Sequence, residues 1–117
     1  MRALPNGKRG APKGAFVADE KTCACKHKRT PRSEELQRDV QTRLNRIIGQ
    51  LNGVKIMIDD NRYCGDVLMQ LSAAESATRR VSEMLLHEHL ETCVVEEIRA
   101  GNDEVVEEAM NLIRRFL

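Results

Sequence analysis

The sequence predicts a small all-α protein, and three observations lead to this prediction. The chain has 117 residues, of which 32% are charged, 3% are aromatic and none is tryptophan, a composition that suits amphipathic helices better than a β-sandwich or barrel. Apolar residues recur in steps of three and four along two stretches, which is typical of helices that pack together. Neither proline nor glycine occurs between Gly65 and Gly101, so one long helix is the simplest interpretation of that stretch. A single copy of so short a chain has difficulty burying a large core, and we expect it to oligomerise.

Residues 1–32 are predicted to form an N-terminal arm outside the helical domain, which spans 33–117. The arm is rich in Gly, Pro and Lys without periodicity, so we expect disorder there. It carries nine Lys or Arg side chains against two carboxylates, whereas the remainder is acidic overall. The arm is a candidate for binding a polyanion, with a solvated leader as the alternative. Within it, Cys23, Cys25 and His27 could form an accessory site for a soft metal, or could include only an incidental pair of exposed thiols.

The first helix is predicted to begin near Ser33, which can cap it. Pro31 just before the cap and two glutamates in the first turn favour a helix start. We expect the helix to end around Asp60-Asn61, with Arg62-Tyr63 as a short link. Its apolar positions form a seam for another helix: they are 36, 40, 44, 47, 51, 54 and 58.

Two further helices are predicted after the link. The long helix closes at Gly101, and Asn102-Asp103-Glu104 opens a third helix with an N-cap and early acidic residues. The apolar row of the long helix consists of Val67, Leu71, Ala74, Thr78, Val81 and Leu85, and continues to His89. The expected buried stripe of the third helix consists of Val106, Ala109, Ile113 and Leu117.

Three side chains suggest a metal site shared between two chains. His89 and Cys93 are four positions apart on the long helix, so they lie on one face and can bind one ion. Cys64 precedes His89 by 25 positions, which is about 37 Å along a helix, so it cannot reach its own partners. A second, antiparallel copy would supply it and create a two-fold dimer with a site at each end. Small side chains near the expected two-fold axis would let two such helices cross closely: Ser72, Ala73, Ala74, Ser76 and Ala77.

The chemistry of this ligand set favours Cu(I). Two thiolates and one imidazole are soft ligands that suit Cu(I) or Zn(II) better than Mg or Ca. Three protein ligands suit trigonal Cu(I), whereas structural zinc sites normally have four. We therefore expect Cu(I) as the effector, ahead of Zn(II) or Ni(II). Each residue alone has an ordinary interpretation, a buried thiol or an interface imidazole, and only the three together point to a metal. His87 is two positions from His89, faces nearly the opposite way, and is expected to be exposed.

Several functions receive no support from the sequence. It has no apolar signal segment and no apolar run long enough to cross a membrane, so we expect a cytoplasmic protein with reduced thiols and no membrane partner. It also lacks a glycine-rich phosphate loop and a nucleophile elbow. We do not expect an enzyme.

Four segments of the chain closely resemble the copper-sensing repressor (CsoR) family of bacterial transcription factors. The resemblance covers roughly residues 33–117, and its Cys-His-Cys pattern is specific to the copper-sensing branch. Relatives that sense nickel or cobalt, formaldehyde or reactive sulfur vary at these same positions. The segments are Arg43-Leu-Asn-Arg46-Ile-Ile-Gly49-Gln50, Tyr63-Cys64, Gln70-Leu-Ser-Ala-Ala, and Leu86-His-Glu-His89-Leu-Glu-Thr-Cys93-Val94.

The resemblance implies a three-helix protomer, an antiparallel four-helix-bundle dimer and a dimer-of-dimers homotetramer. The metal-free form would bind operator double-stranded DNA and repress a copper-export operon. Cu(I) bound by Cys64 of one chain with His89 and Cys93 of the other would release the DNA.

The resemblance also implies roles for residues around the ligands. The family's Tyr and Glu that support the metal-binding histidine fall on Tyr63 and on Glu108, with the adjacent Glu107 as the alternative. Such a contact would turn metal binding into a shift of the third helix. The family's DNA-contacting basic positions match Arg43 and Arg80, with Arg46 beside them; some relatives have a basic residue where this chain has Asn45.

Two rival functions stay open. The first is a repressor of the same family that senses reactive sulfur, an aldehyde or another metal, with Cys64 as the reactive thiol. The second belongs to another class, a copper chaperone or buffer, which would have no use for Arg43, Arg46 and Arg80.

Overall fold

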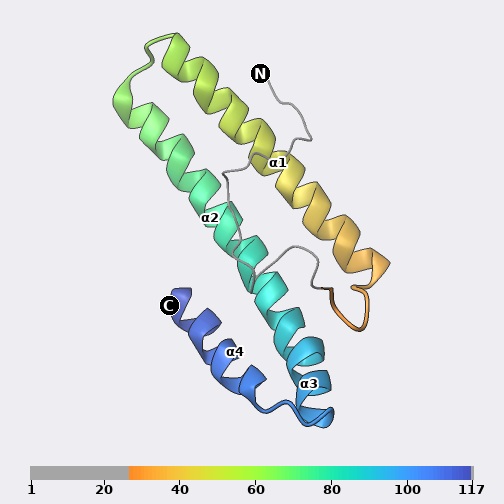
Figure 1. The fold of residues 1–117 in the computed structure, drawn as a ribbon. Coiled ribbons are helices and arrows are strands. Elements are labelled where there is room, and N and C mark those ends of the chain that lie inside the picture. The colour runs from red at the N-terminus through yellow and green to blue at the C-terminus, as the bar shows by residue number, and fades with distance from the viewer. Residues whose placement is uncertain (1–26, 117) are drawn as a thin grey trace.

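The structure, a computed structural model, describes residues 27–116, and in this range it is entirely helical, as predicted (Figure 1). None of the helices in that range is both long enough and apolar enough to span a bilayer. The elements in chain order are α1 (Glu34–Asp59), α2 (Cys64–Glu88), a π-helix η2 (His89–Val94), α3 (Val95–Arg99) and α4 (Glu104–Arg115).

The ends of α1 are set by local interactions, as predicted. Ser33 is the N-cap, and its Oγ accepts a hydrogen bond of 3.1 Å from the backbone N–H of Leu36. Two glutamates in the first turn face the positive end of the helix dipole. After the last helical residue, Asn61 adopts φ 52°, a left-handed conformation that asparagine tolerates better than most residues. This turn sends the chain back into α2.

α1 and α2 run antiparallel and form the core of the protomer (Figure 1). The buried residues recur every seven positions: Val40, Ile47 and Val54 on α1, and Val67, Ala74 and Val81 on α2. Such a spacing is that of a coiled-coil seam. The predicted apolar rows are therefore confirmed at these positions, whereas Leu51, Ile58, Leu71 and Thr78 from the same rows are exposed.

The small residues near the middle of α2 do not share one face. Ala74 is buried in the protomer, and Ala77 packs against the cluster of Val40, Ile47 and Val81. Ser72, Ala73 and Ser76 are exposed. The prediction that all five allow a second copy to cross closely is therefore wrong for Ala74, which is buried within the protomer, and stays a prediction for the other four.

The predicted long helix is continuous to Arg99 but changes its hydrogen bonding on the way. From His89 to Val94 the chain forms a π-helix, with α-helix on both sides. Segments of this kind are rare and often lie at functional sites. Helix-forming residues occupy both sides of the switch, so the residue pattern does not reveal it. The helix ends as expected at Gly101, whose φ of 93° is accessible to glycine at no steric cost.

α4 turns back from α3 toward α2, as Figure 1 shows. Arg79 of α2 donates a 3.0 Å hydrogen bond to the carbonyl of Phe116 at the end of α4. Val105 and Ala109 are the buried residues of α4, while Val106 is 47% exposed. The prediction of Val106 as a buried residue is wrong by one position, because the face of α4 that meets η2 and α3 is the neighbouring one. The predicted Leu117 lies outside the described residues.

Candidate metal centre

Two of the three predicted ligands lie in the π-helix at the end of α2. His89 is its first residue and Cys93 its fifth, and both line one cavity of about 480 Å³. The Nε2 atom of His89 is buried and has no hydrogen-bond partner in the described part of the chain. A buried polar atom without a partner is costly, and imidazole nitrogen is a common metal ligand. This nitrogen beside a thiol therefore fits a soft metal ion.

The third predicted ligand lies far from the other two. Cys64 is the first residue of α2 and is exposed, whereas His89 follows the last residue of this 25-residue helix, so the two are about 37 Å apart at the α-helical rise. Within residues 27–116, no group of three or more His, Cys, Asp or Glu side chains could hold a metal. One chain thus carries Cys64 at one end of α2 and the His89–Cys93 pair after the other end, and cannot form the predicted three-ligand site by itself.

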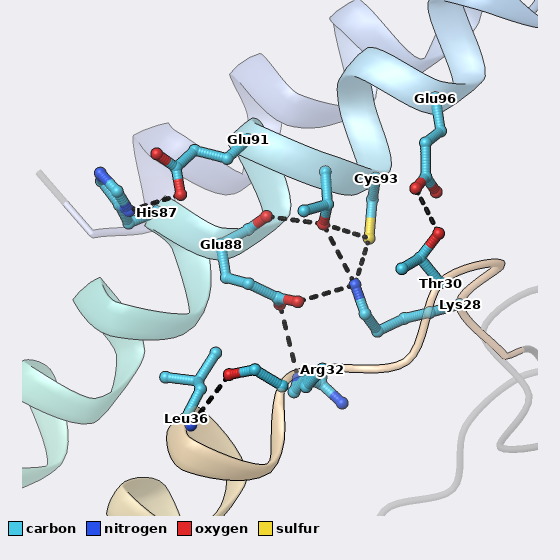
Figure 2. Close-up of polar contacts among 11 residues, drawn as sticks. Lys28, Thr30, Arg32, Leu36, His87, Glu88, Glu91, Cys93 and Glu96 are labelled. Atoms are coloured by element: carbon cyan, nitrogen blue, oxygen red, sulfur yellow. Dashed lines mark hydrogen bonds and ion pairs between the residues drawn. The ribbon is translucent and has the colours of Figure 1, made fainter.

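A lysine from the arm contacts the candidate ligand Cys93 (Figure 2). Lys28 Nζ donates to Cys93 Sγ at 3.1 Å and to Thr92 Oγ1 at 3.2 Å, and it forms an ion pair with Glu88 Oε2 at 2.9 Å. Burial by itself would lower the pKa of Lys28, but the hydrogen bonds and charges of Glu88 and Cys93 outweigh it and raise the pKa above its ordinary value. The ammonium is therefore charged at neutral pH.

The residues that follow Lys28 hold the arm on the same surface. Three more polar side chains of the arm pair with glutamates of α2 and α3, whereas the sequence predicts a disordered arm up to residue 32. The pairs are Arg29 Nε with Glu97 Oε2 at 2.8 Å, Thr30 Oγ1 with Glu96 Oε2 at 2.5 Å, and Arg32 Nε with Glu88 Oε1 at 3.5 Å.

Sequence reasoning missed these contacts. The available signal was the contrast between the basic arm and the acidic remainder of the chain. That contrast shows that the arm could pair with the domain, but not which residues meet.

The predicted accessory site lies only partly in the described residues. His27 lines the cavity that contains His89 and Cys93, whereas Cys23 and Cys25 are outside the described range. The arm therefore brings one imidazole to the candidate centre.

The residues expected to support the ligands occupy different ends of the molecule. Glu108 of α4 lines the cavity with His89 and Cys93, and Glu107 does not. Tyr63 directly precedes α2, next to Cys64, and is 75% exposed. His87 is exposed, as predicted, and its Nδ1 lies 3.3 Å from Glu91 Oε1 (Figure 2).

The three predicted DNA-contacting arginines lie at one level of the α1–α2 pair. Arg46 directly precedes Ile47 on α1, Arg43 lies about one turn earlier, and Arg80 directly precedes Val81 on α2; both apolar residues belong to one core cluster. Arg46 and Arg80 are exposed and Arg43 is partly exposed. Two of the arginines pair with a carboxylate on their own helix: Arg43 Nε with Asp39 Oδ1 at 3.0 Å, and Arg80 Nη1 with Glu83 Oε1 at 3.6 Å.

Most of the helical domain matches a known sequence family. Residues 36–115 match the family described as metal-sensitive transcriptional repressors. The copper-sensing transcriptional repressor CsoR of Bacillus subtilis is 34% identical over 92 residues, which are 77% of this chain and 91% of the relative. The copper-sensing transcriptional repressor RicR of Mycobacterium tuberculosis is 42% identical over 78 residues, which are 64% of this chain and 81% of the relative.

Solved structures show the same fold. The copper-sensing repressor CsoR with Cu(I) from Geobacillus thermodenitrificans is 42% identical with a TM-score of 0.70, over 76% of this chain and 94% of that one. The nickel-responsive transcriptional regulator InrS is 34% identical with a TM-score of 0.58, over 78% of this chain and 100% of that one. All of these proteins are transcriptional regulators, which confirms the prediction that the chain is not an enzyme. By sequence, by fold and by the resemblance of its copper-sensing segments, the chain belongs to the metal-sensitive transcriptional repressors of the CsoR family.

Proposed function

We propose that this protein is a Cu(I)-responsive repressor that binds operator DNA in its metal-free form and derepresses copper efflux genes when Cu(I) binds. His89 and Cys93 of one chain and Cys64 of a second copy would hold the ion. The observation that carries the proposal is the buried, unpartnered Nε2 of His89 in a cavity that Cys93 also lines.

An antiparallel pair of α2 helices would complete the site. Cys64 is exposed at one end of α2, and the His89–Cys93 pair follows the other end, so a two-fold axis across the helix brings each half site to its complement. The single chain also leaves large apolar side chains exposed, including Ile56 at 68%, Leu68 at 63% and Met69 at 70%. Apolar surface of this kind favours association. We propose a homodimer of this design, paired further into a homotetramer.

The ligand chemistry and the relatives favour copper. Two thiolates and one imidazole form a soft set, and three such ligands suit Cu(I). CsoR of Bacillus subtilis and RicR of Mycobacterium tuberculosis are copper-sensing proteins by name. Ni(II) is the second candidate, because the similar structure InrS is a nickel-responsive regulator.

Arg43, Arg46 and Arg80 would contact the DNA backbone. Guanidinium groups bind phosphate oxygens well, and these three lie close to the same core cluster of the α1–α2 pair.

Glu108 would link metal binding to DNA binding, because it lies on α4 and lines the cavity of His89. A carboxylate that orients a ligating imidazole can turn metal binding into a movement of its own helix.

The test is fluorescence anisotropy of the metal-free protein on DNA from its own promoter region, titrated without oxygen with Cu(I), Ni(II), Zn(II) or persulfide. We expect release by Cu(I), and no release in His89→Ala. The matched control is His87→Ala, which removes an exposed imidazole two positions away and should leave release intact.

Other outcomes would identify a different function. Release by Ni(II) alone would identify a nickel sensor, and release by persulfide alone would identify a sulfur sensor. An absence of specific DNA binding would contradict the repressor proposal and leave a copper buffer.

A further inference from the structure

We infer that Lys28 is an internal competitor for the metal site: its ammonium group holds Cys93 in the metal-free protein and must leave before an ion can bind there. Lys28 would thereby set the ion concentration at which the protein responds. This inference rests on the proposed function, because it requires Cys93 to be a metal ligand.

The contacts of Lys28 place a positive charge where an ion would bind. Nζ lies 3.1 Å from Cys93 Sγ, and the Lys28 side chain is only 14% exposed. A metal–thiolate bond is about 2.3 Å long, so an ion and the ammonium on one sulfur would be two cations at close range. Their repulsion is weakly screened at a poorly exposed site. The two cations therefore exclude each other from Cys93.

The surrounding segment keeps Lys28 at this position. Arg29 and Thr30 pair with Glu97 and Glu96, and neither contacts Cys93. Because these pairs hold the chain against α3 directly after Lys28, Lys28 meets Cys93 at a high effective concentration. Thr92 and Glu88 add two further contacts to the ammonium itself. A competitor held in this way occupies the site in most of the metal-free molecules.

Competition of this kind lowers the apparent affinity for every ion by the same factor. If the site is free of Lys28 in about one molecule in ten, the apparent affinity falls about tenfold. An ion that binds soft ligands tightly, such as Cu(I), still displaces the lysine at low concentration. The ratio of affinities between ions is unchanged, so Lys28 would set the ion concentration at which the protein responds without being a ligand.

The experiment compares Lys28→Gln with Arg29→Gln in the full-length protein. The Cu(I) affinity is measured without oxygen by competition with the chromophoric chelator bathocuproine disulfonate. We expect Lys28→Gln to bind Cu(I) about tenfold more tightly than the unmodified protein. Arg29→Gln removes a neighbouring charge that does not contact Cys93, and it also removes one of the pairs that anchor the segment, while the Thr30–Glu96 pair is kept. We therefore expect a much smaller rise in Cu(I) affinity than in Lys28→Gln, about twofold at most. Lys28→Met, with circular dichroism to verify helicity, repeats the test with an apolar side chain of similar length.

Each remaining outcome overturns the inference. Unchanged affinity in folded Lys28→Gln and Lys28→Met would show that the lysine does not compete, and weaker affinity would show that it supports Cys93 as a ligand. In both cases Cu(I) binding by the unmodified protein would leave the proposed function standing. If the unmodified protein binds no Cu(I), the proposed function fails as well.

Discussion

At the residue scale, Gly65 determines where the ring of Tyr63 can lie beside Cys64. A Cβ atom at position 65 would lie 2.6 Å from Cε2 of Tyr63, so Gly65→Ala must move the ring. Because Tyr63 is exposed, we expect the ring to move freely and the free energy of unfolding to rise by up to about 1 kcal/mol from the better helix propensity of alanine. Chemical denaturation measures the stability, and fluorescence of Tyr63, the single tyrosine of the chain, reports the movement.

Gly49→Ala is the matched control, since a Cβ there would have no neighbour within 4 Å. It should give a similar gain in stability with unchanged tyrosine fluorescence. A loss of more than about 1 kcal/mol in Gly65→Ala alone would show that the position of the ring is itself important for stability.

The residues of the candidate centre differ in how far the sequence could identify them. His89 and Cys93 are four positions apart on a helix, and helical geometry alone places them together. Lys28 contacts Thr92 and Cys93 across 64 and 65 positions. No periodicity links residues so far apart, so only the folded chain could show that the arm reaches the thiol.

At the element scale, Thr92 makes contacts that we expect to stabilise the π-helix. Its hydroxyl donates a 2.8 Å hydrogen bond to the carbonyl of Glu88, where α2 gives way to the π-helix, and accepts one from Lys28. Thr92→Val keeps the shape and removes both bonds, so we expect a loss of about 1–2 kcal/mol in the free energy of unfolding.

Thr78→Val is the control for this change. Thr78 makes the same 2.8 Å bond to the carbonyl four residues earlier, but in the middle of the regular helix α2 and not at the change to π-helix. We expect a loss of less than about 0.5 kcal/mol. Equal losses in the two variants, measured by urea denaturation, would contradict a special role for Thr92.

Helix ends were more predictable than helix register. Ser33 and Gly101 set their helix ends through local chemistry that is visible in the residue type. The switch to π-helix at His89 and the burial of Val105 in place of Val106 depend on packing between distant segments. A shift of one position in register follows from such contacts, and the residue pattern of one helix does not contain them.

At the scale of the whole molecule, the chain is an incomplete unit. α2 separates Cys64 from His89 and Cys93 by its full length, and several large apolar side chains lie exposed. Both features were predictable, because helix length and chain size follow from the sequence. The antiparallel arrangement of two copies is the central proposal, and two variants that each lack one cysteine ligand can test it.

The most direct measurement is Cu(I) binding by a mixed dimer of Cys64→Ser and Cys93→Ser chains, co-expressed with different tags and purified through both. Each variant alone lacks a ligand at both sites of its dimer. In the mixed dimer, the Cys93→Ser chain supplies Cys64, and the Cys64→Ser chain supplies His89 and Cys93. The proposed arrangement predicts one tight Cu(I) site per mixed dimer and none in either parent. A mixed dimer that binds no more Cu(I) than its parents would contradict a site shared between chains.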